Sequence, residues 1–140
     1  MKANKITNYN LPSSRVISIA DKKPIQANEI NYNSKIILPV LEGFEFVHIN
    51  LIKYLKADGA YVSIILADGR KVTAAKTLKA MTLKMPEQFF IRIHQSYLVN
   101  MEYVSKYDKK NAYLVLDGGE NVTVSRSGGQ RMKEYISNNI

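Results

Sequence analysis

The sequence lacks cysteine altogether, so the chain forms neither a disulfide framework nor a thiolate metal site. It also lacks long apolar runs, because none approaches the ~20 residues that a membrane-spanning helix requires. The first ten residues are polar and contain no apolar stretch of the kind found in signal peptides. Together these absences predict a cytoplasmic protein without a membrane segment.

Catalytic and metal-binding patterns are equally scarce. The two histidines, His48 and His94, lie far apart and have no carboxylates at a metal-ligand spacing. On a strand Ser96 shares a face with His94 and can contact it, but the sequence marks neither an oxyanion site nor an orienting carboxylate. No Walker loop and no glycine-rich dinucleotide motif occurs. We therefore predict that the protein is not an enzyme, holds no metal and no cofactor, and uses its histidines structurally.

Positive charge is what the sequence has in excess. Lys and Arg number 20 and Asp and Glu 12, which gives a net charge of +8 and a pI near 9.6. Such a balance favours a polyanionic partner, with nucleic acid ahead of an anionic membrane or an acidic protein. The alternative is that the charge serves solubility alone.

Residues 1–34 differ in composition from the rest of the chain. They carry six asparagines, two prolines and a net charge of +3, and they sustain no hydrophobic period. We predict a linker or N-terminal extension here, with one short strand around residues 15–20. A dense apolar pattern begins at Lys35, so residues 35–140 are predicted to form the folded domain.

Short strands dominate the structure predicted for this domain. They are expected at residues 36–41, 44–49, 53–56, 61–66, 70–74, 102–107, 112–116 and 120–124. Asp-Gly pairs at 68–69 and 117–118 mark hairpin turns. One helix is expected over 77–85, where Pro86 ends an apolar pattern of helical spacing, and a second, short helix over 130–136. Since strands and helices do not alternate, the fold class is mostly β with mainly antiparallel sheets.

Residues 89–100 (FFIRIHQSYLVN) combine two characters that seldom occur together. Polar side chains are threaded through a run of aromatic and β-branched residues, namely Arg92, His94, Gln95, Ser96 and Asn100. A pure core strand would not hold so many hydrogen-bonding groups, and a surface loop would not hold so many apolar ones. Part of this segment must therefore be both buried and polar.

The same segment carries a family resemblance. Phe90–Asn100 closely resembles the F-x-R-(V/C)-H-x-S-(Y/F)-(L/V)-V-N signature of the LytTR family, bacterial DNA-binding domains that are usually output modules of two-component response regulators. Tyr54–Val62 resembles the strand–loop–strand that precedes an Asp-Gly hairpin in that family, and Val124–Arg126 resembles its closing V-S-R. The three motifs agree in order and spacing, and the resemblance covers about residues 35–138.

This resemblance implies an elongated fold of about ten strands in small packed sheets with one or two short helices. It implies double-stranded DNA binding by loops that enter successive major grooves and bend the duplex. The base contacts carried over from the family are Tyr61, Gln95 and Arg126, and the candidate backbone contacts are Lys56, Lys76, Ser96, Ser125 and Arg131. Arg92, His94 and Asn100 are expected to form a buried polar frame that presents Gln95.

The residue types suit these roles. Arginine can donate a bidentate pair to guanine and glutamine can pair with adenine, whereas contacts to phosphate position the protein without specifying sequence. From Lys35 onward the sequence has 15 basic and 10 acidic residues, which gives a net charge of +5. The alternative interpretations are that Tyr61 only covers a strand end, that Gln95 and Arg126 are ordinary surface residues, and that residues 109–110 form a solvated loop.

Two features depart from the family pattern. Ser127-Gly128-Gly129 follows where further basic residues are common, and these glycines are expected to weaken helix initiation and phosphate contact. No receiver domain precedes the domain, so we expect a stand-alone regulator or a fragment, with a receiver domain or sensor kinase as outside partner. The expected target is double-stranded DNA with repeated sites, on which two copies of the protein can form a dimer. The alternative is a β-rich basic module that binds an acidic protein or RNA and has lost its DNA contacts.

Overall fold

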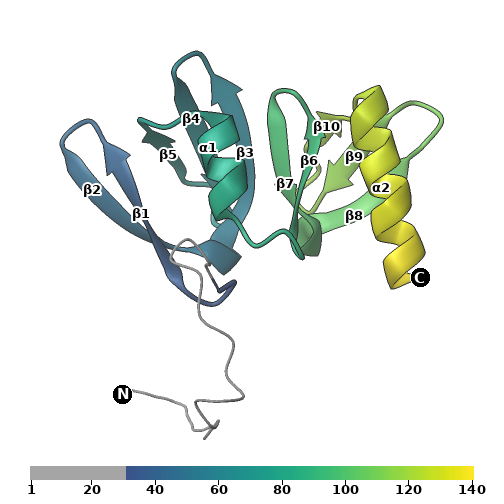
Figure 1. Cartoon of the computed structure of the whole chain (residues 1–140), viewed down its shortest axis with the longest axis horizontal. Coiled ribbons are helices and arrows are strands. Elements are labelled where there is room, and N and C mark those ends of the chain that lie inside the picture. Colours follow the sequence, from purple (N-terminus) through teal and green to yellow (C-terminus); the bar gives the residue numbers. More distant parts are fainter. Residues whose placement is uncertain (1–30) are drawn as a thin grey trace, which may run out of the picture.

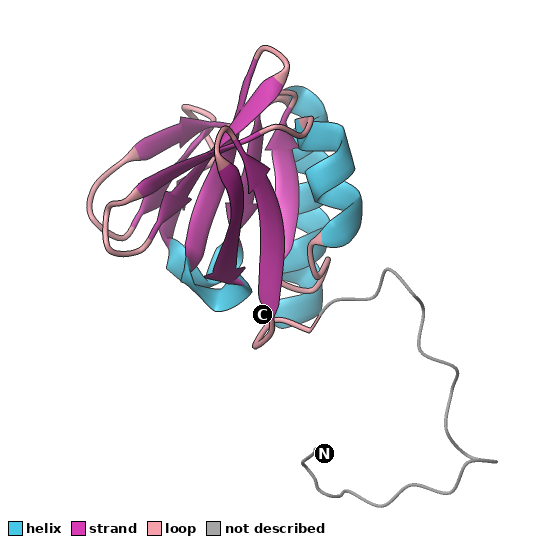
Figure 2. Ribbon diagram, turned by 90° about the vertical axis from the view of Figure 1, so that its left-hand side faces the viewer, coloured by secondary structure: helices cyan, strands magenta, loops and turns pink. Residues whose placement is uncertain are grey.

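Among the described residues, ten strands form three small antiparallel sheets, and two α-helices pack beside them. The structure is a computed structural model that describes residues 31–140, so the strand expected at 15–20 lies outside the described residues. Figure 1 shows the sheets in a row, and Figure 2 shows the two α-helices along one side of the strands. The mostly β fold class predicted from the sequence is confirmed.

The elements follow the chain from one end of this row to the other (Figure 1). The first sheet pairs β1 (Lys35–Val40) with β2 (Gly43–His48). The second has the order β5-β4-β3-β7-β6, formed by β3 (Ile52–Asp58), β4 (Tyr61–Leu66), β5 (Lys71–Ala74), β6 (Phe90–His94) and β7 (Tyr97–Asn100). The third has the order β10-β9-β8, formed by β8 (Val104–Asp108), β9 (Tyr113–Leu116) and β10 (Asn121–Thr123). The helices are α1 (Leu78–Lys84) and α2 (Arg126–Asn139), and short 3-10 turns at Ile49–Leu51 and Met101–Tyr103 precede β3 and β8.

Local sequence signals explain several of these boundaries. Gly69, in the Asp-Gly pair between β4 and β5, has a φ of 93°, a conformation that glycine adopts without strain. The Oγ1 of Thr77 accepts a hydrogen bond from the Ala80 amide at 3.1 Å and thereby caps α1, which ends just before Pro86 as expected. Neither this helix nor α2 has the length and apolar character needed to cross a membrane, and the same holds for every helix within residues 31–140.

Two hydrophobic cores lie on either side of β7. Leu98 belongs to the first core, which contains the inward side chains of β1, β3 and β4 and of α1. Val99, the next residue, belongs to the second core, which β9, β10 and α2 share. Because successive side chains of a strand point to opposite faces, one short strand serves both cores. The domain is therefore two packed halves joined along β7.

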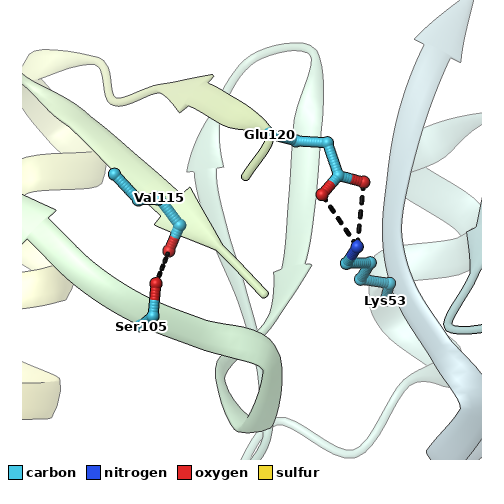
Figure 3. Close-up of polar contacts among 4 residues, drawn as sticks. All are labelled: Lys53, Ser105, Val115 and Glu120. Atoms are coloured by element: carbon cyan, nitrogen blue, oxygen red, sulfur yellow. Dashed lines mark hydrogen bonds and ion pairs between the residues drawn. The ribbon is translucent and has the colours of Figure 1, made fainter. Parts of the chain in front are cut away.

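An ion pair links the two halves (Figure 3). The Nζ of Lys53, on β3, lies 2.7 and 2.9 Å from the two carboxylate oxygens of Glu120, in the turn before β10. The Lys53 side chain is almost completely buried, whereas that of Glu120 is about one-third exposed. Figure 3 also shows the Ser105 hydroxyl donating to the Val115 carbonyl at 3.1 Å, beside the irregular register of β8 and β9. The ion pair therefore connects the second sheet to the turn before β10, whereas the Ser105 hydrogen bond lies within the third sheet.

The segment 89–100 forms a hairpin. Its strands are β6 and β7, and Gln95-Ser96 forms the turn between them. The pairing is in register from Phe90↔Asn100 to Arg92↔Leu98, and a shift follows before His94↔Tyr97. The segment therefore divides into paired strands within the sheet and an exposed turn at one end.

Candidate nucleic-acid interface

The three residues expected to read bases lie at the β3–β4 turn, the β6–β7 turn and the start of α2. Figure 1 shows these two turns and the start of α2 along its upper edge. Tyr61 begins β4 directly after the β3–β4 turn, Gln95 lies in the β6–β7 turn, and Arg126 is the first residue of α2. All three are exposed, and Tyr61 has about half of its surface open to solvent. The fold thus brings together residues that are separated by more than sixty positions in sequence.

Backbone hydrogen bonds connect the first two of these turns. The Ala57 amide donates to the Ser96 carbonyl at 2.9 Å, which extends the β3–β7 ladder into the β6–β7 turn. One residue further along β3, Asp58 is paired with Tyr61 across the β3–β4 turn. The positions of Tyr61 and Gln95 are therefore fixed relative to each other by sheet hydrogen bonds.

The β6–β7 turn is held by the side chains of Arg92 and His94. Arg92 donates from Nε to the His94 carbonyl at 3.1 Å and from Nη2 to the Gln95 carbonyl at 2.6 Å. The Ser96 backbone amide donates to Nδ1 of His94 at 3.0 Å; the contact that the spacing suggested was between side chains on one strand face, but Ser96 lies in the turn and uses its backbone. These bonds use the backbone of the turn and leave the Gln95 side chain exposed. Two half-buried side chains thus fix the backbone of the turn, and the Gln95 amide group is exposed on it.

The start of α2 is attached to the same hairpin. The Ser125 amide donates to the Ile93 carbonyl at 2.9 Å, and the Ser125 hydroxyl accepts from the Gly128 amide at 3.0 Å as the helix cap. Gly128 packs so closely on β6 that a methyl group there would overlap the carbonyl of Ile93 and lie 2.8 Å from its Cα. Arg126 is therefore held next to the β6–β7 turn.

This contact corrects an expectation about the two glycines. They were expected to weaken the start of a helix over 130–136, but α2 begins at Arg126 and runs through both. Glycine at 128 allows the helix to approach the backbone of β6, and the gain from that packing outweighs the helix propensity that glycine loses. The two glycines at the start of α2 thus have a structural cause. They no longer favour the alternative of a basic module that has lost its DNA contacts.

The five candidate backbone contacts fall into two groups. Lys56 on β3 and Lys76, just before the cap of α1, are exposed, and Ser96 is half-buried in its turn. Ser125 caps α2, and Arg131 donates from Nη1 to the Arg92 carbonyl at 2.8 Å. The last two therefore also attach α2 to the edge of β6, a role that their positions in the sequence do not indicate.

The proposed polar frame is not uniformly buried. Asn100 is fully buried, and its Nδ2 donates to the Ile52 carbonyl at 2.9 Å and to the Tyr32 hydroxyl at 3.0 Å. Arg92 and His94 are half-buried, because they lie near the exposed end of the hairpin. Tyr32 lies before the expected boundary at Lys35, and its ring also stacks on Phe89 at a centroid distance of 4.0 Å.

The electrostatics at this edge are positive. Burial, with a smaller contribution from the charge of Arg131, lowers the pKa of the Arg92 guanidinium. Arg126 also borders an open groove of about 1110 Å³ between α2 and the β8–β9 loop, and Lys109 and Lys133 line this groove. Sequence reasoning assigned Lys109 to a solvated loop and did not select Lys133, because only the fold brings these cations next to Arg126.

Comparisons with known proteins identify the family to which the chain is similar. A family model described as the LytTr DNA-binding domain matches residues 42–137. The sensory transduction protein LytT of Bacillus subtilis is 29% identical over 105 residues, which cover 73% of this chain and 43% of that protein. The CO-responsive transcriptional regulator RcoM of Rhodospirillum rubrum is 30% identical over 110 residues, which cover 76% and 46%. The chain thus spans less than half the length of these curated relatives.

A solved structure gives the same result for the fold. A LytTr DNA-binding domain from Bacillus cereus superimposes with a TM-score of 0.64 at 25% sequence identity. The match covers 74% of this chain and 96% of that domain. Nearly the whole of that solved domain therefore has a counterpart in this chain.

Proposed function

This chain belongs to the LytTr DNA-binding domain family, and we propose that it binds double-stranded DNA in a sequence-specific manner as part of a bacterial transcription regulator. The observation that carries the proposal is that Tyr61, Gln95 and Arg126 are all exposed, at two turns and a helix start that backbone hydrogen bonds link. Turns in a row along an elongated molecule can follow one face of a duplex and enter successive major grooves. Bending of the duplex would let all three turns engage at once.

Each of the three side chains would read DNA by a different chemistry. The guanidinium of Arg126 can donate two parallel hydrogen bonds to O6 and N7 of guanine, and the amide of Gln95 can pair with N6 and N7 of adenine. Tyr61 can donate its hydroxyl to a phosphate or pack its ring on a thymine methyl group. Sequence preference would therefore be concentrated at the positions facing Gln95 and Arg126.

Binding strength would come from the cations around these turns. Lys56 and Lys76 are exposed and free to contact phosphates, and Lys109 and Lys133 extend the basic surface beyond Arg126. Contacts of this kind set register and affinity, and they make affinity fall steeply as salt rises. Ser96 and Ser125 are close enough to the turns to add hydrogen bonds to the backbone of the duplex.

Regulation is also part of the proposal. The relatives named above are described as sensory transduction and transcriptional regulator proteins, and this chain spans less than half of each. We infer that a signal reaches the domain from a receiver domain or sensor kinase outside this sequence. Sites arranged as repeats would allow two copies to bind side by side. The proposal places this activity in the cytoplasm.

Selection of bound duplexes from fragmented genomic DNA by the purified chain tests the proposal. We expect enrichment of one motif containing repeats, bound with nanomolar-to-micromolar affinity that falls with a steep salt slope. Recovery of duplexes without any shared motif would contradict sequence-specific reading. Tight binding of an acidic protein or an RNA, with no duplex enriched, would favour the interaction-module alternative instead.

A further inference from the structure

The hairpin of β1 and β2 has an apolar outer face that is largely open to solvent among residues 31–140. Its inner face places Ile36, Leu38 and Val47 in the first core. On the outer face Ile37 lies directly opposite Phe46, and these two side chains are 55% and 63% exposed. The hairpin is therefore apolar on both faces, although only one of them is covered.

The outer face continues to the tip of the hairpin. Phe44, paired with Pro39, is 68% exposed, and Leu41 in the turn is 96% exposed. Together with Ile37 and Phe46 these side chains expose roughly 500 Å² of apolar surface, at about 180 Å² for each large side chain. A contiguous patch of that size is at the upper end of what a monomer exposes and is often functional.

We propose that residues 15–20 of the same chain dock on this outer face. The segment reads Arg-Val-Ile-Ser-Ile-Ala, and in an extended conformation Ile17 and Ile19 point to the same side. The two isoleucines would pack on Phe44 and Phe46. This covers apolar surface without involving the edge that carries Tyr61.

The length of the chain allows this contact. The described chain begins at Asn31, and β1 begins four residues later at the base of the hairpin. Tyr32 fixes that point through its stacking on Phe89. The ten residues 21–30 can span ~33 Å, whereas a six-residue strand such as β2 is ~20 Å long. Every part of the outer face is within reach of residues 15–20.

Affinity favours this occupant over a second copy of the chain. A tethered segment meets the face at an effective concentration on the order of millimolar, so a weak contact is sufficient. A second copy would have to associate through roughly 500 Å² per partner, which is less than the ~800 Å² of a standard interface.

The absence of cysteine allows a direct test in the full chain. We expect the variant I17C/F46C to form an intrachain disulfide under mild oxidation at least tenfold faster than I17C/L83C. Leu83 on α1 is a suitable control because it is at least as exposed as Phe46 (72% against 63%) but lies outside the proposed site. Mass spectrometry of the monomer identifies the bond. Equal rates for the two pairs would overturn the proposal, and so would fast dimerisation of F46C alone, which would assign the face to a second copy.

A second measurement needs no crosslink. Replacing both isoleucines, in I17S/I19S, should raise bis-ANS fluorescence several-fold by uncovering the hairpin, whereas the control I6S/I25S should resemble the unmodified chain. Adding F44S and F46S to I17S/I19S should abolish the increase. Unchanged fluorescence in I17S/I19S, or the same increase in the control, would show that residues 15–20 do not cover this face.

Discussion

Gly128 gives the sharpest test of how α2 is placed. In G128A the new methyl group would overlap the backbone of Ile93, so α2 must move away from β6. The move would strain the packing by about 1–3 kcal/mol and weaken the Ser125 cap and its bond to Ile93 by about 1 kcal/mol each. The higher helix propensity of alanine would offset about 1 kcal/mol of this loss in stability. We expect a net loss of about 2–4 kcal/mol in the free energy of unfolding.

The neighbouring glycine is a matched control. A methyl group on Gly129 would lie 3.5 Å from the Tyr107 hydroxyl, an ordinary contact, so G129A should gain about 0.5–1 kcal/mol from helix propensity. Urea unfolding followed by circular dichroism measures both variants. Movement of Arg126 should also weaken DNA binding in G128A, and binding should be retained in G129A. If G128A were as stable as the unmodified chain, or G129A were the less stable variant, the close approach of α2 to β6 would be refuted.

Three further predictions concern stability and binding. E120Q leaves Lys53 buried without a carboxylate and should cost about 1–3 kcal/mol in the free energy of unfolding. Because the Lys53 hydrogen bond lowers the pKa of Glu120, the ion pair stabilises the fold above the ordinary glutamate pKa of about 4.3, and this contribution is lost in acid. The urea midpoint of E120Q should therefore depend less on pH in the acid range than that of the unmodified chain. A112G should gain about 0.5–1 kcal/mol in urea unfolding, because Ala112 has a φ of 58°. H94A should lower the free energy of unfolding by about 1 kcal/mol, because the hydrogen bond from the Ser96 amide is lost, whereas Q95A should keep its stability and change DNA binding. The opposite pattern in unfolding and binding titrations would contradict the division of roles in this hairpin.

Sequence reasoning succeeded where local signals decide the structure. The Asp-Gly pair at 68–69 forms the hairpin turn between β4 and β5, and the helix predicted over 77–85 begins at its Thr77 cap and ends before Pro86. The family resemblance is confirmed by the match over 42–137. These features depend on contacts within a few residues, or on a motif whose spacing is specific.

Prediction from sequence was weaker where the structure depends on tertiary contacts. The turn at Gln95-Ser96 contains no glycine, proline or aspartate, so nothing local marked where the segment 89–100 folds back into β6 and β7. Gly128 resembled a helix breaker until its contact with Ile93 was known. The roles of Tyr61, Gln95 and Arg126 at DNA stay predictions, because the fold shows that they share an edge but not what they bind.

DNA binding by R126A at a duplex selected with the unmodified chain tests the central claim most directly. Titration of the selected site and of all single-base variants gives affinity and base preference together. The account predicts a loss of about 1–3 kcal/mol in binding free energy and relaxed preference at one base position, with preference elsewhere retained. An R126A variant that is folded and binds every duplex with unchanged affinity and preference would contradict the reading of DNA by this edge.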